Sequence, residues 1–205
     1  MRHHLLTSVF FLATLMPLAG TSAAADRPTV EYSADSVIEH AEGAMKSRVY
    51  STPTKERRDM TQEGMAMVTI TRHDKKVMWT LMPEEKMYME MKQGAQPSNK
   101  DDLSAYTIEQ TVVGPETLNG LSVNKSKMIM THSDGSKFGG FMWTTKEGIL
   151  VKLDALSVEQ GNKERFKIEL SNLKIGKQDP ALFEIPPGYE TMPGMDMGSI
   201  MNMMK

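Results

Sequence analysis

The chain has 205 residues, 24 basic and 26 acidic side chains, a formal net charge of −2, 20 methionines and no cysteine. The lack of cysteine excludes disulfides, thiol catalysis and thiolate metal sites. Because the charges are nearly balanced and the lysines are interspersed with acidic residues, nucleic acid is not expected as a partner.

Residues 1–25 predict a secretory signal peptide. A basic start precedes an apolar run over residues 5–18, and small residues lead to an expected cleavage site near Ala25. No later stretch approaches the roughly 18 apolar residues of a membrane-spanning helix. We therefore expect an exported, periplasmic protein that starts near Asp26 and has no transmembrane span in its mature part. The alternative is an uncleaved hydrophobic anchor.

Residues 26–190 predict a single, mainly β domain. Short runs with alternating apolar and polar residues recur between turn residues, a pattern typical of an antiparallel meander. Strands are expected over residues 30–32, 45–51, 55–61, 65–72, 77–81, 86–92, 106–113, 122–131, 136–145, 149–158 and 164–173. So many short strands favour a strongly curved sheet or an incomplete β-barrel, although their spacing does not establish long-range pairing.

Three segments lie outside this alternation. The polar residues 93–104 predict a long loop with a short helix, which would act as a small lid. The segment 179–190 is expected to close the domain, with Leu182 and Phe183 packing back onto the sheet. Residues 191–205, rich in methionine and glycine, predict a flexible tail.

Methionine spacing provides the main functional clue. In KMYMEMK, residues 86–92, every second residue is methionine, which places three thioethers on one side of a strand. An unbranched, polarizable side chain gives an apolar lining that adapts to irregular ligands. The alternative is an ordinary core in which methionine fills gaps. The candidate ligand-binding residues are Met65, Met67, Met78, Met87, Met89, Met91, Met128 and Met130.

A tryptophan, either Trp79 or Trp143, is expected near these methionines. Because Trp79 directly follows Met78, a regular strand places at most one of these two side chains on the ligand side.

Catalysis has little support in the sequence. The mature part keeps only three histidines, His40, His73 and His132, and it has no zinc-protease, nucleophile-elbow or phosphate-loop motif. We therefore predict no catalytic residues and no enzyme. Convergence of the three histidines on a metal is a minor alternative to their lying at the surface.

The methionines of the tail suggest a different chemistry. Thioethers favour Cu(I) and Ag(I), so a second hypothesis is metal capture by Met195, Met197, Met201 and Met203. A disordered end, or a strip that covers the apolar face, is the plainer interpretation. Otherwise we expect no cofactor. A third hypothesis is an envelope module that binds a protein through a strand edge or the tail.

Several short stretches resemble the LolA/LolB-like periplasmic lipoprotein-sorting carriers. These are the arginine-bearing residues 57–60, the acidic turn and tryptophan strand of residues 70–79, the proline turn at Pro83, and the closing residues 170–189. The resemblance covers most of the expected mature chain.

The resemblance implies an incomplete antiparallel barrel whose concave interior holds acyl chains under a lid. It also implies that Arg57 or Arg58 compares with the arginine that holds the lid closed in these carriers. A long N-terminal helix and a lipid anchor are not evident here. The expected ligand is therefore hydrophobic, such as a lipid or a lipoprotein acyl chain, while delivery of lipoproteins to a receptor is not implied.

Overall fold

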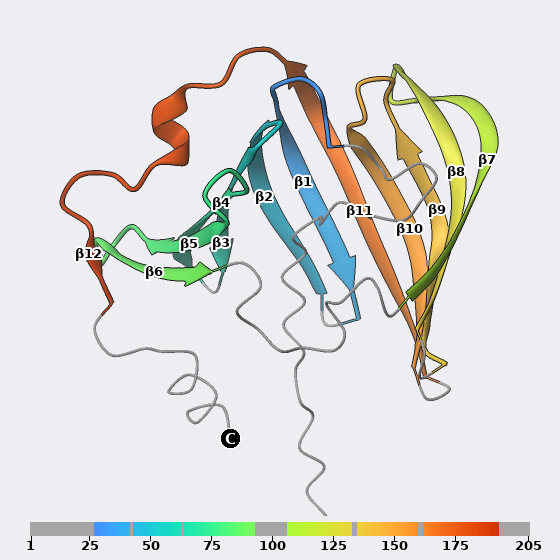
Figure 1. Ribbon diagram of the computed structural model, residues 1–205, viewed down its shortest axis with the longest axis horizontal. Helices are drawn as coiled ribbons and strands as arrows, with labels where there is room; N and C mark the ends of the chain where they lie inside the picture. The colour runs from blue at the N-terminus through green and yellow to red at the C-terminus, as the bar shows by residue number, and fades with distance from the viewer. Residues whose placement is uncertain are drawn as a thin grey trace, which may run out of the picture.

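One curved sheet makes up most of the fold in a computed structural model of the chain (Figure 1). The structure describes residues 27–41, 43–62, 64–92, 106–132, 135–159 and 162–192. Within them lie β1 (Tyr32–His40), β2 (Gly43–Thr52), β3 (Lys55–Gln62), β4 (Met65–Arg72), β5 (Val77–Met82), β6 (Met87–Lys92), β7 (Tyr106–Leu118), β8 (Leu121–His132), β9 (Lys137–Thr144), β10 (Leu150–Glu159), β11 (Asn162–Ile175), η2 (Pro180–Phe183) and β12 (Glu190–Thr191).

Two antiparallel meanders form the sheet. Its strand order is β12-β6-β5-β4-β3-β2-β1-β11-β10-β9-β8-β7, so pairing of β1 with β11 joins the first meander to the second. Among the described strands, only β12 runs parallel to its neighbour, β6. Because β7 and β12 are both edge strands, the described sheet is open, which confirms the predicted curved, incomplete barrel.

Local sequence explains the hairpins of the meanders. Between β7 and β8, Leu118 pairs with Leu121, which leaves Asn119 and Gly120 as a two-residue loop. Both have positive φ, 51° and 79°, as a type I′ turn requires. Asparagine and glycine tolerate this conformation better than other residues, so the sequence favours a tight reversal here.

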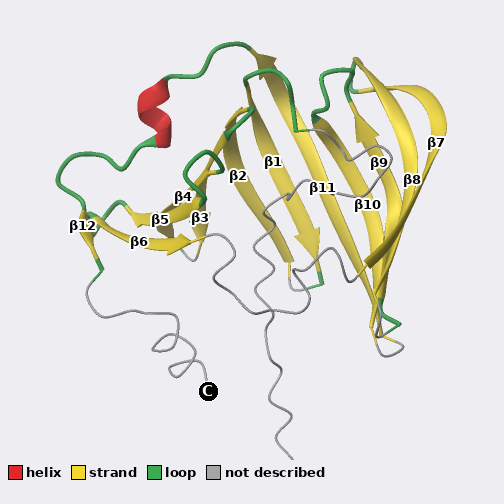
Figure 2. Ribbon diagram, in the orientation of Figure 1, coloured by secondary structure: helices red, strands yellow, loops and turns green. Residues whose placement is uncertain are grey.

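The segment after β11 crosses one face of the first meander and includes η2, the red helix in Figure 2. Asp179 caps the helix by accepting a hydrogen bond from the backbone N–H of Ala181. Phe183 is 1% exposed and Leu182 packs with it against residues of β4 and β5, as predicted. Among the described residues, no helix is long and apolar enough to cross a membrane.

Two arginines attach this segment to the sheet. Arg57 Nη1 donates to the carbonyl oxygen of Leu182 at 3.0 Å, and Arg72 Nη1 donates to that of Phe183 at 3.2 Å. Arg72 also pairs with Glu184, and it donates two hydrogen bonds to Asp74, at 2.8 and 2.7 Å. The hydrogen bonds from Arg72 lower the pKa of Asp74 from 3.8 to about 2.

This pKa predicts acid sensitivity with a defined sign. Because the pKa of Asp74 is lower in the folded state, its stabilising contribution is present above pH ~4 and is lost as the pH falls toward ~2. Asp74→Asn should lower the melting temperature at neutral pH and flatten its fall between pH 5 and pH 2. Scanning fluorimetry across this range provides the measurement. Parallel curves for the two proteins would contradict the assignment.

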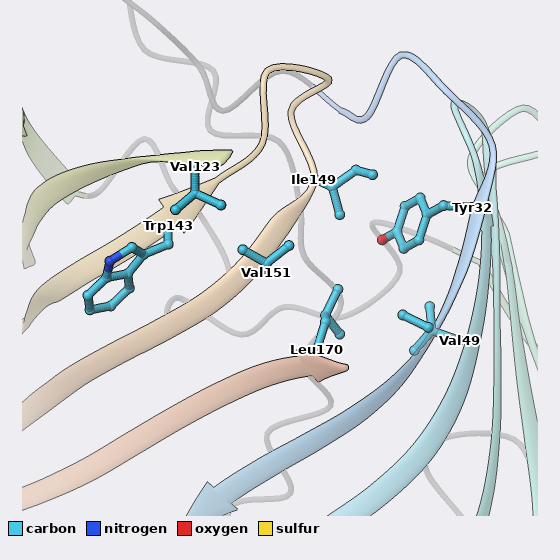
Figure 3. Packing of buried hydrophobic residues seen from close by; sticks show 8 residues of the cluster. Tyr32, Val49, Val123, Trp143, Ile149, Val151 and Leu170 are labelled. Atoms are coloured by element: carbon cyan, nitrogen blue, oxygen red, sulfur yellow. The ribbon is translucent and has the colours of Figure 1, made fainter. Parts of the chain in front are cut away.

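Apolar contacts also join the two meanders (Figure 3). Tyr32 and Val49 lie on the β1–β2 side and Trp143 and Val123 on the β8–β9 side, with the other labelled residues between them. The labelled residues of this cluster are Tyr32, Val49, Val123, Trp143, Ile149, Val151 and Leu170. The sheet is therefore held at its centre by packing as well as by hydrogen bonds.

Candidate functional site

Strand register brings the predicted methionines to one face of the sheet. Directly opposite residues in an antiparallel pair point to the same face. The register pairs Met60 with Met67, Met78 with Met91, and Met82 with Met87. Through β1 and β11 the same face continues to β8, where Met128 lies opposite Gly140.

We call this surface the methionine face. It carries all eight methionines that the sequence predicted, together with four that the prediction missed. The twelve are Met45, Met60, Met65, Met67, Met78, Met82, Met87, Met89, Met91, Met128, Met130 and Met142. The four missed methionines join the predicted ones through pairing between strands. The spacing of residues along a single strand does not reveal this pairing.

Exposure varies along this face. Met78, Met128 and Met142 are buried, whereas Met65 is 55% exposed and the others are half-buried. In the second meander, Phe138 and Phe166 contact each other edge to face beside Met128 and Met142. The face is therefore an apolar surface that is partly core and partly accessible.

The opposite face is different in character. Over β4 and β5 it is covered by the segment that contains η2. At the centre of the sheet it carries charged pairs, including Arg48 with Asp35 at 2.9 Å and Arg165 with Asp154 at 2.7 Å. An apolar ligand is therefore better matched to the methionine face.

Neither tryptophan lies on the methionine face, which corrects the expectation that one would be near the candidate lining. Trp79 pairs with Ile70 on the opposite face, where its Nε1 donates to Glu90 at 2.9 Å. Trp143 pairs with Lys125 and Lys152, whose ammonium groups lie 4.9 and 5.4 Å from its ring centroid. The physical reason is strand alternation, because each tryptophan follows a methionine of the candidate face.

The two candidate arginines also separate by alternation. Arg57 is on the opposite face, where it contacts the Leu182 carbonyl oxygen. Arg58 is on the methionine face, paired in register with Val49 and Thr69. The expected lid over residues 93–104 lies outside the described residues, so the comparison with a lid-holding arginine stays a prediction.

Arg58 belongs to a polar cluster within this apolar face. Its Nε donates to Glu56 Oε1 at 2.7 Å, and both side chains are largely buried. Burial opposes the charged form of Arg58, but the nearby Glu56 carboxylate outweighs it and raises the Arg58 pKa. Burial and Glu56 also raise the pKa of Tyr32 to about 12. The arginine is therefore held as a buried cation beside its counter-ion.

Within the part of the chain that the structure describes, three buried polar atoms on this face have no hydrogen-bond partner: Arg58 Nη1, Thr69 Oγ1 and Ser36 Oγ. Arg58 and Thr69 are direct cross-strand neighbours. Unpaired buried polar groups are costly, about 1–3 kcal/mol each, so such a pair in one place calls for an explanation. Sequence reasoning had no signal for this feature.

Other sequence-based predictions fall elsewhere. The signal peptide of residues 1–25 and the tail methionines Met195, Met197, Met201 and Met203 lie outside the described residues. Within the described ranges, no three histidine or carboxylate side chains gather as a metal site would require.

Comparison with known proteins places the chain among related folds. A family model described as domain of unknown function DUF4412 matches residues 33–165. An uncharacterized conserved protein from Thermus thermophilus is 13% identical, with a TM-score of 0.54 over 80% of this chain and 90% of that one. No curated protein matches.

Two further solved structures have lower TM-scores. The Pseudomonas aeruginosa MucA/MucB complex gives 17% identity and 0.46, over 80% of this chain and only 64% of the matched chain. A LolA superfamily protein from Nitrosomonas europaea gives 10% identity and 0.41, over 77% and 91%.

Proposed function

The chain belongs to the DUF4412 family of domains of unknown function, and we propose that it is an exported binding protein that holds a hydrophobic ligand on its methionine face. The ligand class is a lipid or the acyl chain of a lipoprotein. This is a binding role without catalysis. The one observation that carries the proposal is the register that gathers twelve methionines on a single face.

Physical chemistry favours this use of the face. Removing apolar surface from water contributes roughly 25 cal/mol per Å². Binding of an acyl chain to half-buried methionines is therefore favoured by burial of the surface of the chain and of the methionine side chains. Methionine repacks at little cost, which suits chains of differing length or branching. Arrangement on strands, rather than on loops, keeps the lining in place while the side chains adapt.

A charge placed in the lining should weaken this binding. Met89 is half-buried between Thr80 and the edge of the sheet, so Met89→Asp introduces a carboxylate where the acyl chain would lie. We expect affinity for a pyrene-labelled long-chain fatty acid methyl ester to fall at least about tenfold. Pyrene fluorescence titration measures it. Lys92→Asp, exposed on the opposite face of the same strand, is the matched control and should bind as the parent does.

Native mass spectrometry of gently purified protein complements this titration, with co-purified lipid as the expected result. A protein that is uniformly empty and does not bind the pyrene ester would contradict the proposal.

A second candidate function is capture of Cu(I) or Ag(I), now favoured by a specific feature of the sheet. Three cross-strand pairs, such as Met78 with Met91, each place two methionines directly opposite each other. Soft thioether ligands suit these ions. Met78→Leu with Met91→Leu separates the two functions, because leucine retains apolar surface and lacks sulfur. If calorimetry shows that the double variant no longer binds Ag(I) while its affinity for the ester is unchanged, the metal-binding function is favoured. A truncated protein ending at Met192 would show how much of the Ag(I) binding depends on the tail.

A further inference from the structure

The unpartnered donors at the centre of the methionine face point to a ligand with a polar group. Arg58 and Thr69 face each other across β3 and β4, and opposite side chains in such a pair have Cβ atoms about 4.5–5.5 Å apart. Arg58 Nη1 and Thr69 Oγ1 are both buried without a hydrogen-bond partner among the described residues. A single acceptor oxygen placed between them would satisfy two atoms at once.

We infer that Arg58 and Thr69 form a hydrogen-bonding anchor for the carbonyl oxygen of an esterified or amidated acyl chain whose hydrocarbon part lies on the methionine face. The inference rests on the proposed function and deepens it, since it names the group that orients the ligand. Arg58 donates from Nη1 and Thr69 from its hydroxyl. The ester or amide thereby takes the place of the water that these donors lose on burial.

Charge decides which acceptor fits best. The Arg58 guanidinium is already neutralised by Glu56, whose carboxylate accepts from Arg58 Nε at 2.7 Å. A second carboxylate beside this pair would be repelled by Glu56 and would have to be desolvated without a cation of its own. A neutral carbonyl oxygen accepts the two hydrogen bonds without either cost. Esters and amides are therefore preferred over free fatty acids.

Cross-strand rows lead from this anchor to methionines on the same face. The cross-strand row that contains Arg58 and Thr69 continues through Thr80 to Met89. The neighbouring row passes through Thr71 and Met78 to Met91. An acyl chain anchored at Arg58 and running toward β6 would thus first contact threonines and then methionines.

Competition with three ligands of equal chain length tests the anchor. In this assay, a methyl ester, a free fatty acid and an alkane each compete with a pyrene-labelled alkane for binding to the parent protein. We expect the ester to bind about tenfold more tightly than the alkane and more tightly than the acid. Thr69→Val removes the hydroxyl and keeps the shape, so the ester should lose most of its advantage. Since this hydroxyl has no partner in the ligand-free protein, the variant should remain at least as stable as the parent.

Two other variants complete the design. Glu56→Gln leaves the Arg58 charge uncompensated, so the preference should shift toward the free acid. Thr61→Val, on the opposite face of β3, is the control and should leave all three affinities unchanged.

Equal affinities for ester and alkane in the parent protein, or an unchanged ester preference in Thr69→Val, would overturn the anchor and leave chain binding intact. Failure of all three ligands to displace the probe, or of the probe to bind, would overturn the proposed function and the anchor together.

Discussion

Phe183→Ala is expected to lower the free energy of unfolding by about 3–5 kcal/mol, because it empties a closed apolar site. Phe183 is 1% exposed and packs against β4 and β5 on the face opposite the methionines. The backbone around it is held by Arg57 and Arg72, so the segment cannot easily collapse into the space. The large end of the range is therefore expected.

Urea denaturation followed by tryptophan fluorescence measures this loss, with Trp79 in the same cluster as a local probe. Ile175→Ala is the matched control, because Ile175 is 52% exposed and should cost no more than about 0.5 kcal/mol. A similar, small loss for both variants would show that η2 does not stabilise the sheet.

Gly140→Ala is the second large effect, and it arises from close contact between strands. An added Cβ would lie 2.0 Å from the carbonyl oxygen of Asp154 and 2.5 Å from Cα of Ala155, both backbone atoms of β10. Neither atom can rotate away, so β9 and β10 must move apart. We expect a loss of at least about 3 kcal/mol, at the upper end for overpacking.

Gly176→Ala provides the control for this glycine. An added Cβ there meets no atom within 4 Å, and Gly176 does not have a positive φ. Its urea midpoint should stay close to that of the parent, while Gly140→Ala should show a much lower midpoint or fail to accumulate as soluble protein. Equal midpoints for the two variants would mean that the sheet relaxes around residue 140.

These two sites lie on opposite faces of the sheet. Phe183 packs on the face of the first meander that carries η2, and Gly140 lies beside Met128 on the methionine face of the second meander. Both faces of the sheet therefore contribute to the core, because Val49, Leu153 and Ile168 are buried on the methionine face.

Much of the fold followed from local alternation. The strands around Met65, Met78 and Met87 form where period two predicted them, and the same parity correctly separated Met78 from Trp79. Side chains of a strand alternate whatever its partners are, so one strand's sequence suffices for this prediction. The packing of Leu182 and Phe183 was likewise signalled by adjacent large apolar residues in a proline-rich segment.

Long-range pairing was decided only by the tertiary structure. Local spacing does not specify that β1 pairs with β11, and that pairing places Met128 and Met130 on the same face as Met65 and Met67. Likewise, two neighbouring arginines look equivalent in sequence, yet Arg57 secures η2 while Arg58 is buried with an unpaired nitrogen among methionines. Alternation is a property of one strand, whereas register and burial depend on which distant strand lies beside it.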